Sequence, residues 1–71
     1  MNIKKKFGIR VKQLRIEKKL SQEALAIDAN VDRGYLSNLE NGKGNISIEN
    51  IEKILDALGV TFNEFFSEKI F

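Results

Sequence analysis

The sequence predicts a compact all-α domain of five short helices spanning residues 1–71. A chain of this length supports one hydrophobic core, and no segment alternates apolar and polar residues with the period of two that marks a strand. Four of the expected helix starts combine an N-cap residue type with a hydrophobic staple. The staple is formed by the residue before the cap (N′) and the fourth residue of the helix (N4). The four N-caps, each with its staple pair, are Ser21 with Leu20 and Leu25, Asp32 with Val31 and Leu36, Ser47 with Ile46 and Ile51, and Thr61 with Val60 and Phe65.

The first helix is expected from about Ile3 to Lys19. Gly8 lies inside it, where glycine costs about 1 kcal/mol relative to alanine, so we expect a neighbouring helix to approach closely there. One side of this helix carries an apolar stripe that is expected to face the core. Ile9 and Ile16 lie on the opposite side and are either isolated exposed residues or part of a partner surface. The stripe, with spacings of four, four and three, consists of Ile3, Phe7, Val11 and Leu14.

The remaining helices are expected to begin near residues 22, 33, 48 and 62. Thr61 and Glu64 form a capping box at the last of these starts. Residues that tolerate the left-handed conformation mark three helix ends, namely Asn30, Gly42 and Gly59. The fourth helix has one apolar face, predicted to be core, made of Ile48, Ile51, Ile54, Leu55 and Leu58.

The composition argues against an enzyme. The chain has no cysteine and no histidine, which removes thiolate nucleophiles, imidazole bases and the commonest zinc ligands. No glycine pattern matches a nucleotide-binding loop. We therefore expect no catalytic residue, no metal, no cofactor and no small-molecule ligand. The longest apolar run, Ala24 to Ile27, is too short for a membrane span or a secretory signal, so we expect a cytoplasmic protein.

Charge is distributed unevenly along the chain. Residues 1–20 hold eight cations against one carboxylate, whereas residues 21–71 hold four cations against nine carboxylates. A concentrated positive surface attracts a polyanion such as duplex DNA. The alternative is an ordinary solvated helix face.

Two short helices joined by a turn around Asn30 occupy residues 21–42. In the second of them, the residues without a core role are small and polar and include one arginine. Such a face fits the major groove of DNA, where arginine can bond to guanine and asparagine to adenine. The alternative is a helix that is merely soluble on its outer side. The residues without a core role are Asp32, Arg33, Gly34, Ser37, Asn38 and Asn41.

Several segments match a known family, namely Leu14 with Arg15, Leu20 to Ala26 and Val31 to Gly42. Through them, nearly the whole chain resembles the helix-turn-helix domain of Cro/lambda-repressor-type (XRE) regulators. Two further segments, Asp32 to Ser37 and Gly44 to Ile54, more closely resemble the controller proteins of restriction–modification systems. This resemblance implies a lambda-repressor-like fold and a small dimeric transcriptional regulator that acts on its own promoter and on that of a nuclease.

The resemblance also implies roles for single residues. Arg33 is the expected reader of guanine. Gly34 stands where controller proteins commonly carry threonine, so any contact made by that side chain is absent here. The positions that face bases are matched by Arg33, Gly34, Ser37 and Asn38, and those that contact the DNA backbone by Gln22, Asn41, Lys43 and Asn45.

Arg15 and Glu40 match a charged pair that bridges the first and third helices of the family, and a half-buried pair of this kind is costly to break. The DNA surface that the resemblance implies, residues 21–45, carries only two cations against four carboxylates. The lysines cluster in the first helix instead. Lys4 to Lys6 could reach the DNA backbone as an arm, or Lys18 and Lys19 could flank Gln22.

The C-terminal segment, residues 58–71, is expected to form a homodimer interface. Its last ten residues include four phenylalanines, and the core of one small domain is not expected to bury all of them. A dimer would present two recognition helices about 34 to 36 Å apart to a pseudo-palindromic operator. Two alternatives are an antitoxin that binds its toxin through Ile9 and Ile16, and an interaction module that has lost DNA binding. The interface residues are predicted to be Phe62, Phe66, Ile70 and Phe71.

Overall fold

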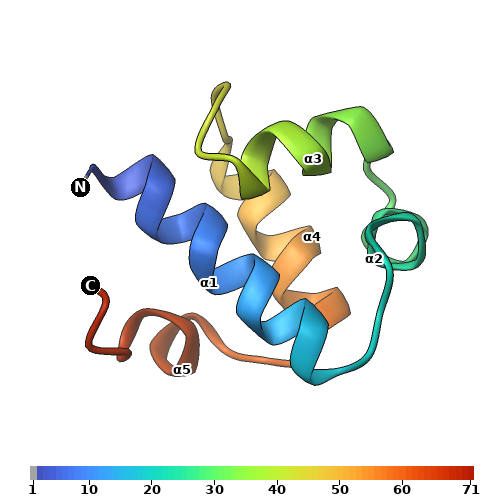
Figure 1. Ribbon diagram of the computed structural model, residues 1–71. Helices are drawn as coiled ribbons and strands as arrows, with labels where there is room; N and C mark the ends of the chain where they lie inside the picture. The colour runs from blue at the N-terminus through green and yellow to red at the C-terminus, as the bar shows by residue number, and fades with distance from the viewer. Residues whose placement is uncertain (1) are drawn as a thin grey trace.

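The computed structural model describes residues 2–71, which form five helices and no strand, as predicted. Helices α3 and α5 lie on opposite sides of the long helix α1, and α4 lies behind it (Figure 1). The helices are α1 (Ile3–Glu17), α2 (Gln22–Ala29), α3 (Arg33–Glu40), α4 (Ile48–Leu58) and α5 (Phe62–Phe66).

The helix termini follow the predicted capping pattern. Glu64 closes the capping box by accepting a hydrogen bond from the backbone N–H of Thr61 at 2.9 Å. At two C-termini, Asn30 and Gly59 adopt left-handed conformations with φ of 56° and 73°. Each N-cap side chain accepts a hydrogen bond of 3.0–3.2 Å from the backbone N–H three residues further on, and these caps are Ser21, Asp32, Ser47 and Thr61.

Helix α1 begins at Ile3, as predicted, but its C-terminal end differs from the prediction. It ends at Glu17 rather than Lys19, because Lys19 turns into the left-handed region with φ of 59°. Nothing in the local sequence signals this turn, since lysine is not a typical left-handed residue. At the other end, Asn2 caps the helix by accepting from the backbone N–H of Lys5 at 3.0 Å. The first lysines are therefore helical and do not form an extended arm.

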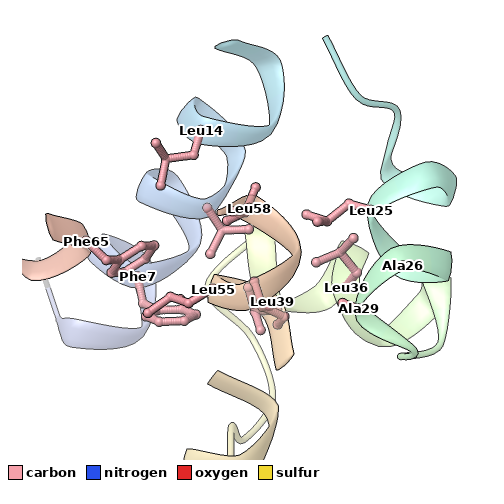
Figure 2. Packing of buried hydrophobic residues seen from close by; sticks show 12 residues of the cluster. Phe7, Leu14, Leu25, Ala26, Ala29, Leu36, Leu39, Leu55, Leu58 and Phe65 are labelled. Atoms are coloured by element: carbon pink, nitrogen blue, oxygen red, sulfur yellow. The ribbon is translucent and has the colours of Figure 1, made fainter. Parts of the chain in front are cut away.

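All five helices contribute to the hydrophobic core, whose central side chains face one another in Figure 2. The predicted core position is wrong for two residues, because Ile3 is 61% exposed and Ile48 is 70% exposed. Each is the first residue of its helix, where the neighbouring helices no longer cover the apolar face. The core consists of Phe7, Val11, Leu14, Leu25, Ala26, Ala29, Leu36, Leu39, Ile54, Leu55, Leu58 and Phe65.

The predicted close approach at Gly8 is confirmed. A Cβ atom on Gly8 would lie 2.3 Å from the carbonyl oxygen of Leu39 and 2.9 Å from that of Glu40. Only glycine therefore lets α1 pack directly against the backbone at the end of α3. This contact fixes the position of α3 relative to the longest helix of the domain.

Candidate nucleic-acid interface

Helices α2 and α3 are joined by a tight turn that brings α3 to the surface. The backbone N–H of Val31 donates to the carbonyl of Ala26 at 2.9 Å, which closes the turn after the left-handed Asn30. On α3, Leu36 and Leu39 are buried in the core. Of the four predicted base-facing residues, Arg33, Gly34 and Asn38 are exposed, and Ser37 is half-buried.

A buried ion pair anchors the end of α3. The guanidinium of Arg15 binds the carboxylate of Glu40 through two hydrogen bonds, Nε to Oε2 at 2.7 Å and Nη2 to Oε1 at 3.1 Å. The two side chains are only 11% and 2% exposed. Arg15 also donates from Nη1 to the carbonyl of Leu20 at 2.8 Å, so it ties α1 both to the start of the α2 region and to α3.

The carboxylate of Glu40 also binds Gln22. The Nε2 of Gln22 donates to Oε1 of Glu40 at 3.0 Å. One amide hydrogen is thereby used, while the second remains to donate to another acceptor. The sequence places Gln22 correctly at the start of α2 but gives no sign that Glu40 orients its side chain.

The loop after α3 is shaped by glycine. Gly42 and Gly44 have φ of 75° and 77°, and the backbone N–H of Lys43 turns back to the carbonyl of Asn38 at 2.9 Å. The three residues predicted to contact the DNA backbone, Asn41, Lys43 and Asn45, are all exposed on this loop. The bond from Lys43 to Asn38 places this loop beside the C-terminal end of α3.

The first-helix lysines divide into two groups. Lys4 donates from Nζ to Oδ1 of Asn45 at 3.1 Å, which places the start of α1 beside the loop. Lys18 lies at the other end of α1, where a Cβ on Gly59 would be 3.4 Å from its Nζ. The ammonium of Lys18 therefore lies beside the C-terminus of α4.

The C-terminal phenylalanines are shared between the core and the surface. Phe65 is fully buried, and Phe66 and Phe71 are half-buried against the core, with ring centroids 4.8 and 5.7 Å from that of Phe65. Phe62 remains 40% exposed, and Ile70 is half-buried. Because Phe66 and Phe71 already pack within the protomer, less of the predicted interface is free than the sequence indicates.

Arg10 has a structural role that the sequence pattern did not predict. It is buried, its Nη2 lies 3.3 Å from Oε1 of Glu68, and its guanidinium carbon lies 5.9 Å from the centre of the Phe65 ring. Its position three residues after Phe7 is the available signal, since this spacing places it beside the core stripe. Arg10 thereby attaches the C-terminal turn to α1.

Comparisons with known proteins agree with this geometry. The helix-turn-helix family profile matches residues 11–65, and control protein C.MunI of Mycoplasma sp is 50% identical over 68 residues, covering 94% of this chain and 92% of that protein. The chain belongs to the helix-turn-helix family, and within it to the controller proteins.

Two solved controller-protein structures have the same fold as this helix-turn-helix domain. The restriction-modification controller protein C.AhdI from Aeromonas hydrophila is 44% identical, with a TM-score of 0.84 over 87% of this chain and 94% of that one. C.Esp1396I bound to a 25 base pair operator site is 35% identical, with a TM-score of 0.85 over 93% of this chain and 87% of that one. No helix within residues 2–71 is long and apolar enough to cross a membrane.

Proposed function

We propose that this controller-family protein is a sequence-specific transcriptional regulator that binds operator DNA as a homodimer and controls a restriction–modification system. The observation that carries the proposal is the exposed polar face of α3, held outward by the buried pair of Arg15 and Glu40. A relative of the same fold, C.Esp1396I, is bound to a 25 base pair operator site. Cytoplasmic localisation follows as part of the proposal.

Base recognition is assigned to α3. Arg33 is its first residue and is exposed, so its guanidinium is free to form two hydrogen bonds with a guanine in the major groove. Asn38 offers an amide for adenine, and Ser37 a hydroxyl. Gly34 brings the helix backbone close to the base edges without a side chain of its own.

Contacts to phosphates are assigned to both ends of this helix pair. Gln22 donates with its remaining amide hydrogen at the start of α2, in an orientation fixed by Glu40. Asn41, Lys43 and Asn45 donate from the loop after α3. These contacts fix the position of α3 on the duplex, and they carry no sequence information.

Dimerisation is assigned to the C-terminal segment. Phe62 is exposed, and its ring centroid lies 6.3 Å from that of the half-buried Phe66. This apolar surface and the half-buried Ile70 and Phe71 would form the twofold interface. A dimer then places two α3 helices on successive turns of one face of the duplex, and regulation follows from where the operator lies relative to the promoter.

Selection of bound fragments from random duplexes tests the proposal and yields the operator. The selected duplex should bind with an affinity that falls steeply between 50 and 200 mM salt. Arg33→Ala should cost about 1 to 3 kcal/mol per half-site and relax discrimination at one base pair of each half-site, whereas Gln22→Ala should weaken binding to all sequences alike. Absence of a selected sequence, or no effect of Arg33→Ala on affinity and preference, would contradict the proposal.

A further inference from the structure

The first turn of α1 and the loop after α3 form a basic surface made of Lys4, Lys5 and Lys43. The hydrogen bond from Lys4 Nζ to Oδ1 of Asn45, 3.1 Å long, joins the two segments. A Cβ on Gly42 would lie 2.7 Å from Cγ of Lys5, so the stem of this lysine packs directly on the loop. Lys4 and Lys43 line the same hollow between α1 and the loop.

The charges of this basic surface are unfavourable for the helix that carries two of them. The N-terminus of a helix is the positive end of its dipole, where acidic residues stabilise and cations destabilise. Helices α2, α4 and α5 follow this rule with Glu23, Glu49 and Glu64 in their first turns, whereas the first turns of α1 and α3 contain no acidic residue. The first turn of α1 carries three consecutive lysines, residues 4–6. Local helix stability therefore does not explain these lysines.

Carboxylates of the same chain do not explain the lysines either. Within residues 2–71 the ion pairs are Arg10 with Glu68 and Arg15 with Glu40, so Lys4 and Lys5 are not paired with a carboxylate. Glu40, which ends α3 close to this surface, is buried and already bound by Arg15 and Gln22. The positive charge of the basic surface is thus left for a partner outside the chain.

The position of the basic surface indicates which partner fits. It continues directly from the loop residues assigned to the DNA backbone, and the start of α1 lies beside that loop, on the side of α1 that carries α3 (Figure 1). Asn45 also gains from the contact, because Lys4 occupies its Oδ1 and leaves its amide group to donate outward. Phosphates are the anions that a duplex bound to α3 would present here.

We propose that Lys4 and Lys5 bind DNA phosphates next to those contacted by the loop, and that the start of α1 is thereby a further part of the DNA-binding surface. The inference rests on the proposed function and extends it. It accounts for the small number of cations in residues 21–45, since the missing positive charge is supplied by the first helix.

The test is the salt dependence of operator binding by Lys4→Gln and Lys5→Gln, measured by fluorescence anisotropy. Each phosphate contact contributes about 0.9 to the slope of log affinity against log salt, so losing one lysine from both protomers should make the slope about 1.8 shallower. The loss of affinity between 50 and 200 mM salt should then be about 12-fold smaller than for the unchanged protein. The affinity ratio of operator over random duplex should stay constant.

Lys53→Gln is the matched control, because it removes one exposed lysine charge from α4, a helix to which no DNA contact is assigned, and should keep the full slope. Circular dichroism should show that Lys4→Gln and Lys5→Gln fold with unfolding midpoints at or above that of the unchanged protein, since a cation leaves the first turn.

If Lys4→Gln or Lys5→Gln keeps the same slope as Lys53→Gln, the assignment of that lysine is overturned. A changed ratio of operator over random affinity would also overturn it, because the lysine would then read bases. If the unchanged protein binds no duplex at any salt concentration, the proposed function itself fails. This last result differs from the others because it needs no variant.

Discussion

Removing Arg15 should destabilise the domain severely. The carboxylate of Glu40 is 2% exposed and receives two hydrogen bonds from Arg15 and one from Gln22. In Arg15→Met the charge of Glu40 would remain buried with only the neutral amide of Gln22 beside it. Breaking a buried pair in this way costs about 3 to 5 kcal/mol. A 71-residue domain has a free energy of unfolding of only about 4 to 11 kcal/mol, so a large part of its stability would be lost.

The assay is urea unfolding followed by circular dichroism, at one fixed protein concentration because dimerisation contributes to apparent stability. The double variant Arg15→Met with Glu40→Met should recover most of the loss, since replacing both charges leaves no buried ion unpaired. Arg33→Met, which changes an exposed arginine, should stay within about 0.5 kcal/mol of the unchanged protein. A loss below about 1 kcal/mol in Arg15→Met, or a double variant less stable than the single one, would refute the reasoning.

Three further predictions concern single positions. Gly8→Ala should lower the free energy of unfolding by about 1 to 3 kcal/mol in the same urea assay, despite alanine's higher helix propensity, because the Cβ would meet the carbonyl of Leu39. The control Gln13→Ala, on the exposed side of α1, should show no such loss. Asp32→Ala should cost about 1 kcal/mol by removing the cap that accepts from the Tyr35 N–H, and an unchanged urea midpoint would argue against this cap. Hydrogen bonds with Thr61, first from its backbone N–H and then with its side chain, lower the pKa of Glu64 below its usual 4.5. This carboxylate therefore contributes stability above pH 4.5, and the contribution is lost as the pH falls through its folded-state pKa. The difference in thermal stability between the unchanged protein and Glu64→Gln should shrink as the pH is lowered from 4.5, and a difference independent of pH would contradict this prediction.

The helix pattern could be predicted because its signals are local. An N-cap such as Ser21 and its staple lie within six residues, so the side chain and the amide that it accepts from are close in any helix that begins there. The end of α1 could not be predicted, since Lys19 adopts a left-handed conformation for which lysine has no preference. The exposed positions of Ile3 and Ile48 depend on where neighbouring helices end, which no local pattern contains.

The candidate site divides in the same way. The exposed face of α3 could be predicted, because the residues that remain after Leu36 and Leu39 enter the core must face solvent. The orientation of Gln22 by Glu40 needs the relative placement of three helices, which depends on the close packing at Gly8. The helical start at Ile3 could be predicted, whereas the bond of Lys4 to Asn45 and the packing of Lys5 on Gly42 could not, because these contacts join segments far apart in the sequence.

The central claim is that the exposed face of α3 reads base edges, and a change of one atom in the DNA tests it most directly. In the selected operator, the guanine assigned to Arg33 is replaced by 7-deazaguanine, which lacks the N7 acceptor of the bidentate contact. Binding by the unchanged protein should weaken by about 1 to 3 kcal/mol, and binding by Arg33→Ala should not change. Equal weakening of both proteins, or of neither, at every guanine of the operator would contradict the claim.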